Sequence, residues 1–235
     1  MKKLLVILAV LALAACTKTA TAPKATASAP SFVLDYTANC TSGGAPTISG
    51  NSISFGSGTQ CQAGRVVATQ SYANITEFRA TVDLSKLSNN YVNASIYLIQ
   101  NPNNPTAQPI GNNYCDAGGN NNQWNCRELD LMETNGNKLF TGANMKNDPA
   151  NGLHDATAID MSKPFDLVTT ITYDTPRMVV TYQQGSTSVV VYDTNDGAGA
   201  QGSGTVDMTD LVATMQNGYW PVISFWQGYS PTGPG

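Results

Sequence analysis

Apolar and polar residues alternate along short stretches of this chain, and turn-forming residues separate the stretches. Residues 91–100 give the clearest example, because Ala94, Ile96 and Leu98 recur at every second position. Side chains of a β-strand point alternately to its two faces, so this period predicts a strand with one buried face. No stretch after the N-terminus has the composition of a long helix, and the pattern therefore predicts an all-β protein.

The same reading predicts the order of elements along the chain. A short helix is expected over residues 206–216, with Asp207 or Thr209 as its cap. Two loops are expected, a long polar one at residues 101–125 and another at residues 147–163, which holds the only histidine, His154. Strands are expected at residues 32–36, 47–55 (interrupted at Gly50-Asn51), 64–70, 78–84, 91–100, 126–136, 138–146, 165–173, 177–184, 188–192 and 220–228.

Residues 126–136, with the sequence Cys-Arg-Glu-Leu-Asp-Leu-Met-Glu-Thr-Asn-Gly, form the most informative strand. The chain has only three glutamates, and two of them, Glu128 and Glu133, lie within six residues on either side of Asp130. Glu128 and Asp130 share a face because side chains alternate with period two. Glu133 lies at odd spacing, so one extra residue near Leu131, a β-bulge, is needed to return it to that face.

This spacing suits general acid–base chemistry on a sugar. Four effective strand steps of ~3.3 Å separate the backbones of Glu128 and Glu133 by roughly 13 Å. Side chains that lean towards each other would then bring the carboxyl groups near the ~5–5.5 Å separation of a retaining glycosidase. The alternative is a solvated acidic face on an edge strand. The apolar residues between the acids argue against it, as does the mutual repulsion of three like charges.

The motif Glu128-Leu129-Asp130-Leu131-Met132-Glu133 resembles the Glu-x-Asp-x-x-Glu signature of glycoside hydrolase family 16, and Thr134-Asn135 is also similar to the related family 7 cellulases. The resemblance implies a concanavalin A-like β-jelly-roll sandwich of two curved antiparallel sheets, with a sugar cleft on the concave face. It also implies that Glu128 is the nucleophile, Asp130 the helper and Glu133 the acid/base. Family members usually end with one more strand, so the edge of the sheet must be completed differently here, for instance by residues 32–36.

The expected activity is a retaining endo-β-glycan hydrolase acting on β-1,3 or β-1,3/1,4 glucans. Two alternatives stay open: a glycan-binding surface lipoprotein without turnover, and a transglycosylase that uses the same site. The chemistry requires no cofactor and no metal. A structural calcium ion would be compatible with the fold, but no acidic loop in the sequence calls for one, so we predict none.

Several residues outside the motif are candidates for binding a polysaccharide or oligosaccharide substrate. Aromatic rings stack on sugars, so we consider Trp226 in the last strand and Tyr114 and Trp124 in the long loop. Core packing is the alternative for Trp226, and loop anchoring is the alternative for the two loop residues. Asn135 follows the acidic motif and could contact a sugar. His154 is expected to be a surface loop residue without a role.

Residues 1–15 have the features of a bacterial lipoprotein signal peptide: Lys2 and Lys3 precede an apolar run that is too short to span a membrane. Residues 13–16, Leu-Ala-Ala-Cys, resemble a lipobox, which implies cleavage before Cys16 and lipidation of that residue. An ordinary secretory signal is the alternative. The non-acidic residue Thr17 favours the outer membrane in a cell with two membranes. Localisation is therefore expected to be the bacterial cell envelope, by a lipid anchor, or the exterior.

Composition agrees with this compartment. Residues 16–30 are a Thr/Ala/Pro/Lys/Ser tether without periodicity, and residues 31–235 are long enough for one sandwich domain, which we expect to be a monomer. Charged residues make up 12% of the chain, and the formal net charge is −4. An acidic chain without a basic patch argues against nucleic acid as a partner, so the membrane contact is expected through the lipid alone.

Four of the five cysteines remain once Cys16 is assigned to lipidation. An oxidising compartment and the absence of a Cys-x-x-Cys pair favour disulfides over a metal site. Three pairings are open, and proximity in sequence favours Cys40 with Cys61 and Cys115 with Cys126. In the chain-entropy treatment each such bridge stabilises the fold by ~3 kcal/mol.

Overall fold

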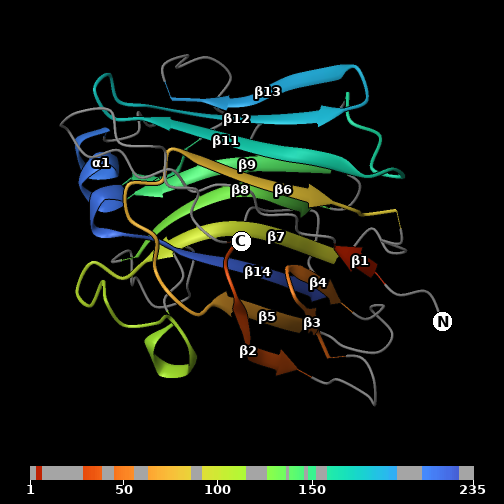
Figure 1. Ribbon diagram of the computed structural model, residues 1–235, viewed down its shortest axis with the longest axis horizontal. Coiled ribbons are helices and arrows are strands. Elements are labelled where there is room, and N and C mark those ends of the chain that lie inside the picture. The colour runs from red at the N-terminus through yellow and green to blue at the C-terminus, as the bar shows by residue number, and fades with distance from the viewer. Residues whose placement is uncertain are drawn as a thin grey trace.

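The computed structural model describes residues 4–6, 29–38, 45–55, 63–85, 92–114, 126–135, 138–145, 148–151, 158–194 and 208–227. Within these ranges the chain is almost entirely β, with one short α-helix and one 3₁₀ turn, η1 (Gly111–Asn113) (Figure 1). The strands are β1 (Leu4–Val6), β2 (Phe32–Ala38), β3 (Thr47–Ser49), β4 (Ser52–Phe55), β5 (Ala63–Ala68), β6 (Glu77–Val82), β7 (Val92–Gln100), β8 (Arg127–Asn135), β9 (Lys138–Met145), β10 (Asp148–Asn151), β11 (Phe165–Thr172), β12 (Arg177–Gln184), β13 (Thr187–Asp193) and β14 (Trp220–Gln227).

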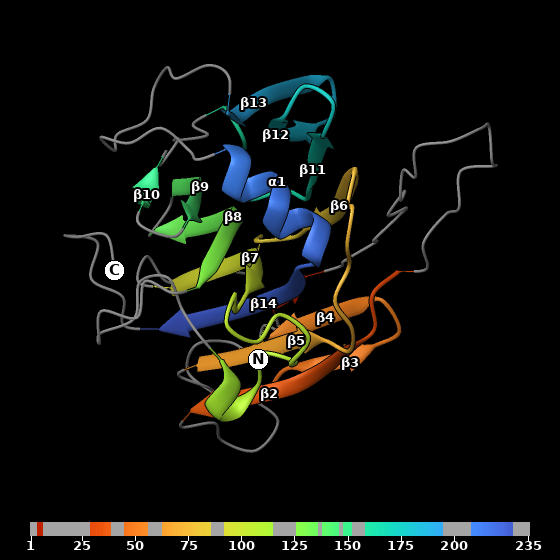
Figure 2. The same cartoon turned by 90° about the vertical axis from the view of Figure 1, so that its left-hand side faces the viewer.

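Two antiparallel sheets make the sandwich. The larger has the strand order β10-β9-β8-β7-β14-β5-β2, and the smaller has the order β13-β12-β11-β6. A third, small sheet has the order β1-β4-β3. Figure 2 shows the four-stranded sheet beside the upper part of the seven-stranded sheet, which runs from β10 down to β2. This all-β architecture confirms the predicted fold class.

The hydrophobic core lies between the two larger sheets. The smaller sheet contributes Phe78 and Leu167, and the larger sheet contributes Ile96, Leu129 and Ile223, each at most 2% exposed. Burial alternates along β12, and along β11 except at Val168, as expected for strands with one face on the core. The other face of the seven-stranded sheet, which turns away from the smaller sheet, is called the open face below.

Most predicted elements are confirmed to within two residues, and one interpretation is wrong. Residues 47–55 form the interrupted strand that was expected, as the hairpin β3–β4 around Gly50, whose φ of 56° suits glycine. Residues 147–163 were expected to be a loop, but β10 pairs with β9 there and extends the larger sheet. The four-residue segment Asp-Pro-Ala-Asn has none of the apolar alternation that marks a strand, so pairing with β9 alone places it in the sheet. His154 lies outside the described residues.

Helix α1 (Met208–Asn217), which was predicted, covers one end of the sandwich (Figures 1 and 2). Leu211 and Met215 on it are buried in the core. Arg127, the first residue of β8, forms a bidentate ion pair with Asp210 of the helix, with distances of 2.6 and 2.5 Å. The helix is thereby fixed against the start of the acidic strand.

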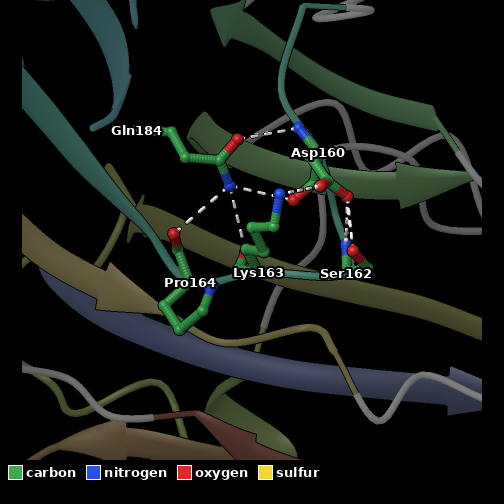
Figure 3. Close-up of polar contacts among 5 residues, drawn as sticks. All are labelled: Asp160, Ser162, Lys163, Pro164 and Gln184. Carbon is green, nitrogen blue, oxygen red and sulfur yellow. Dashed lines mark hydrogen bonds and ion pairs between the residues drawn. The ribbon is translucent and has the colours of Figure 1, made fainter. Parts of the chain in front are cut away.

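A compact turn leads into β11. Gln184, at the end of β12, accepts a hydrogen bond from the backbone N–H of Asp160 and donates to three backbone carbonyls, those of Asp160, Lys163 and Pro164 (Figure 3). The Asp160 carboxylate accepts from the backbone and hydroxyl of Ser162 and pairs with Lys163. One amide side chain therefore fixes the entry to β11.

At the N-terminus, β1 pairs with β4 in antiparallel register. The structure does not describe residues 7–28, which include Cys16 and most of the predicted tether. No helix among the described residues is long and apolar enough to cross a membrane. The signal peptide and the lipid anchor therefore remain predictions.

Candidate active site

The acidic strand β8 contains the expected bulge. Against β7, Glu128 pairs with Ile99 and Asp130 with Tyr97, but the next pair joins Met132 to Ile96, so Leu131 has no partner in the register. Against β9 the register shifts by one between Asp130 and Glu133. The predicted extra residue near Leu131 is confirmed.

The bulge puts all three acids on one face. Glu128, Asp130 and Glu133 pair with Ile99, Tyr97 and Ser95, which are alternate residues of β7 and therefore point the same way. The two glutamates lie opposite positions four residues apart on β7, which corresponds to roughly 13 Å between their backbones.

This shared face is the open face of the larger sheet. The residues between the acids, Leu129, Leu131 and Met132, belong to the core between the sheets and are 0–2% exposed. Glu128 and Asp130 are 8% and 6% exposed, while Glu133 is partly exposed. Buried carboxylates on one face of a strand disfavour simultaneous ionisation, because like charges repel in a poorly solvated site.

Hydrogen bonds join Glu133 to the neighbouring strand. Asn93 Nδ2 donates to Glu133 Oε1 at 3.2 Å, and Ser95 Oγ donates to Asn93 Oδ1 at 2.5 Å. Ser224 Oγ of β14 lies 3.5 Å from Ser95 Oγ. Asn93, Ser95 and Ser224 are each at most 8% exposed, so a chain of buried polar side chains runs from β14 to Glu133. Such groups are retained inside a protein when they are hydrogen-bonded, as here.

The polar row continues across the sheet to Arg65 on β5, which pairs with Ser224. Arg65 Nε donates to Asp35 Oδ2 at 2.6 Å, and the two side chains are 8% and 2% exposed. Its guanidinium carbon lies 3.2 Å from the ring centroid of Tyr114, and Asp35 Oδ1 also accepts from the backbone N–H of Gly111. Burial alone would lower the pKa of Arg65, but the neighbouring Tyr114, Tyr97 and Asp35 outweigh it and raise the pKa, so Arg65 stays charged.

This arrangement fixes the described part of the long loop, residues 101–114, on the open face. The hydroxyls of Tyr114 and Tyr97 share a hydrogen bond of 2.8 Å, and Ile110 packs against a buried cluster that includes Val67 and Val222. Of the two roles considered for Tyr114, the geometry favours loop anchoring, because Arg65 covers one face of its ring.

Trp226, unlike Tyr114, has a ring that is exposed to solvent. Its side chain is 40% exposed on the open face, and its ring stacks on that of Tyr36 of β2, which is 39% exposed, with centroids 5.6 Å apart. Core packing is thus excluded for Trp226. Two strand steps of ~4.8 Å and two residues of ~3.3 Å put its backbone roughly 12 Å from that of Glu133. Edge strand β2 completes the sheet beside β5, as was expected for residues 32–36.

The remaining predicted residues are described only in part. Trp124, Cys40, Cys61 and Cys115 lie outside the described residues, and only the backbone of Asn135 is described. Cys126 is disulfide-bonded, which agrees with the predicted cysteine chemistry, while its pairing with Cys115 remains a prediction.

Sequence reasoning did not find Asn93, Ser95, Arg65, Asp35 or Tyr36. The signal was partly present, since Asn93 and Ser95 are the polar positions that alternate with the apolar residues of β7. What assigns them to the site is the pairing of β7 with β8, which sequence does not give. Among the described residues, no group of three or more His, Cys, Asp or Glu side chains is arranged to hold a metal ion.

Fold and site together define a class: a concanavalin A-like β-jelly-roll sandwich with an acidic strand on its open face. No family model matches the sequence, and neither does any curated protein. Solved structures do match the fold. One, reported for endo-acting O-glycanases that human gut bacteria express to initiate mucin breakdown, has a TM-score of 0.50 and 13% identity over 86% of this chain and 80% of its own.

Two further solved structures are more distant. An endo-1,3-β-glucanase from Streptomyces sioyaensis has a TM-score of 0.46 and 12% identity, over 87% of this chain and 82% of its own. A winged bean acidic lectin, complexed with methyl-α-D-galactose, has a TM-score of 0.35 and 12% identity over 85% of each chain. At such identities the likeness concerns the fold alone.

Proposed function

We propose that this protein is a retaining endo-β-glycan hydrolase of the family 16 type, with Glu128 as nucleophile and Glu133 as acid/base. The observation that carries the proposal is the bulge at Leu131, which puts Glu128, Asp130 and Glu133 on one face of β8. A β-1,3 or β-1,3/1,4 glucan is the proposed substrate. The fold is shared with a structure reported for endo-acting O-glycanases, so mucin-type glycans are a second substrate class to test.

In the first step Glu133, protonated, donates its proton to the glycosidic oxygen as the bond to the anomeric carbon breaks. A Glu128 oxygen bonds to that carbon, and the leaving part of the glycan departs as an alcohol. Asp130, between the two glutamates on the same face, adds a like charge that favours one protonated partner.

In the second step Glu133, now a carboxylate, takes a proton from a water molecule whose oxygen attacks the anomeric carbon. The bond to Glu128 breaks and the free enzyme is restored, with the stereochemistry of the anomeric carbon retained. The N–H donor of Asn93, 3.2 Å from Glu133 Oε1, stabilises the carboxylate form that this step requires.

The stacked pair of Trp226 and Tyr36 supports a proposal for how the glycan lies. Trp226 and Tyr36 are on β14 and β2, both on the same side of β8. A chain that crosses the strands, rather than following them, would reach both rings and the acids. Exposed aromatic rings that lie beside a polar floor suit the alternating faces of a sugar chain.

The test is a hydrolysis panel with purified protein lacking residues 1–15 and with Cys16 changed to Ser. Soluble β-1,3 glucan, β-1,3/1,4 glucan and mucin O-glycans are incubated with wild type, Glu128→Gln and Glu133→Gln, and reducing ends are measured. We expect loss of at least 10³-fold in Glu128→Gln, because no nucleophile replaces the carboxylate. Glu77→Gln is the matched control, because Glu77 is the third glutamate and pairs with Arg79 on β6. Full hydrolysis by Glu128→Gln would refute the assignment.

The products separate the alternatives. NMR of the first product should show the same anomer as the substrate, which distinguishes retention from inversion. Binding of oligosaccharide without new reducing ends would instead identify a glycan-binding protein. Longer products made in the presence of acceptor sugars would identify a transglycosylase.

We also propose that the full chain is attached to a bacterial envelope membrane by lipid at Cys16. The lipobox-like residues 13–16 and the tether that follows support this. Expressed in a bacterial host, the full chain should fractionate with membranes and Cys16→Ser should not. If the full chain and the Cys16→Ser variant were found in the membrane fraction in equal proportion, lipidation of Cys16 would be contradicted.

A further inference from the structure

The bulge that unites the acids is held by side chains from outside β8. Leu131, the extra residue, has no partner in the register with β7 or β9. Its carbonyl accepts a hydrogen bond of 2.9 Å from the hydroxyl of Tyr182, which lies on β12 in the opposite sheet and is fully buried. The contact therefore crosses the hydrophobic core from one sheet to the other.

A second buried hydroxyl holds the preceding carbonyl. Thr141 Oγ1 of β9 donates to the carbonyl of Asp130 at 2.6 Å, and Thr141 is 0% exposed. Two consecutive carbonyls at the bulge thus have side-chain donors. These donors stabilise the bulge, because a buried carbonyl left without a hydrogen-bond donor is destabilising.

The position of the bulge decides which face Glu133 occupies. Side chains alternate with period two, so a β8 without the extra residue would turn Glu133 towards the core while Glu128 stayed on the open face. Groups that fix the bulge at Leu131 consequently fix the relative position of the two glutamates.

The Tyr182 hydroxyl is suited to this contact because it stays protonated at neutral pH. Complete burial raises its pKa well above the ordinary value, and the nearby charges of Glu133 and Asp130 raise it further. The group therefore remains a neutral O–H donor. Its ring packs against Phe165 at a centroid distance of 5.3 Å, so removing the hydroxyl alone leaves the packing in place.

We propose that Tyr182 and Thr141 are positioning residues for the acidic site. They hold the bulge at Leu131 and thereby keep the carboxyl groups of Glu128 and Glu133 on the same face of β8, where both can act on one glycosidic bond. Neither Tyr182 nor Thr141 touches the reacting atoms. The expected effect on catalysis rests on the proposed function. The effect on the position of the Glu133 carboxyl group relative to that of Glu128 does not depend on it.

The small number of glutamates makes the electrostatic coupling between Glu128 and Glu133 simple to measure by NMR. With 13C in the side-chain carboxyl carbon of glutamate, only three signals arise, from Glu77, Glu128 and Glu133. Glu77, on β6 and paired with Arg79, serves as an internal reference. The pH titration of these signals reports how far Glu128 and Glu133 influence each other.

The variants are Tyr182→Phe and Thr141→Val, with Tyr173→Phe as the matched control. The hydroxyl of Tyr173 also donates to a backbone carbonyl, that of Ile75, at 2.7 Å, but neither residue belongs to β8. Circular dichroism and thermal melting establish folding for each. If Tyr182→Phe does not fold, Thr141→Val decides the matter.

We expect the separation between the titration midpoints of Glu128 and Glu133 to narrow in Tyr182→Phe and Thr141→Val and to stay at the wild-type value in Tyr173→Phe. On a hydrolysed glycan, kcat should fall by at least tenfold in the first two variants with KM changed less than twofold. Unaltered titrations in folded Tyr182→Phe and Thr141→Val would overturn the inference. If wild type cleaves no glycan, the proposed function fails, while the titrations still decide whether these residues position the acids.

Discussion

Asn93 lies on β7 with its side-chain amide 3.2 Å from Glu133 Oε1, and Ser95 Oγ fixes the orientation of that amide from the same strand. An N–H donor favours the ionised form of the carboxylate that it contacts. Glu133 therefore accepts a hydrogen bond from a neighbouring strand, and it shares its face of β8 with two other acids. This relation gives the first prediction.

Replacing Asn93 by Ala should move the alkaline limb of the pH–rate profile to higher pH, because the donor that stabilises the carboxylate form of Glu133 is lost. The profile of kcat/KM on the hydrolysed glycan is the measurement. Ser95→Ala should shift the limb in the same direction but less, since Ser95 acts only by orienting Asn93. A limb that moves to lower pH would contradict this role.

Replacing Trp226 by Ala should raise KM for long glycans about tenfold and leave kcat nearly unchanged, because the backbone of Trp226 lies roughly 12 Å from that of Glu133 and the ring would bind the glycan away from the scissile bond. Tyr36→Ala should have a smaller effect of the same kind. Val190→Ala is the control, since Val190 is 57% exposed on β13 of the other sheet. Affinity electrophoresis in gels containing the polysaccharide would measure binding independently of turnover.

Replacing Asp35 by Ala should destabilise the fold by about 3 kcal/mol, because it leaves the charge of Arg65 buried without its ion-pair partner. The backbone N–H of Gly111 loses its acceptor in the same variant. Urea unfolding measures the change. Arg177→Ala is the comparison, because Arg177 pairs with Asp193 at a side-chain exposure of 48% and should contribute less than about 1 kcal/mol.

Replacing Asp160 by Asn should remove a pH-dependent part of the stability. Hydrogen bonds from the Ser162 hydroxyl, Lys163 and the Ser162 backbone lower the pKa of Asp160 from 3.8 to about 2. The stabilisation that this shift represents is complete above pH 4 and is lost as the pH falls towards 2. Melting temperatures of the two proteins should therefore differ at pH 6 and converge near pH 2. A difference that grows on acidification would contradict the assigned contacts.

Several features of this protein were determined by local sequence. Period-two alternation in residues such as Ala94, Ile96 and Leu98 specified the strands, and the odd spacing of Glu128 and Glu133 required a bulge near Leu131, which the register contains. Both inferences succeed because they depend on the chirality and alternation of a single strand. Strand β10 was missed because its pairing with β9, rather than its composition, defines it.

The surroundings of the acids were decided by tertiary structure alone. Asn93 reaches Glu133 only because β7 pairs with β8, Tyr36 reaches Trp226 from a strand 190 residues away in sequence, and Tyr182 reaches the bulge from the other sheet. The register and packing that create these contacts are set by the burial of many side chains at once, which no local pattern encodes. The sequence thus indicated which acidic groups are candidates for the proposed chemistry, and the packing of the two sheets determined which side chains contact them.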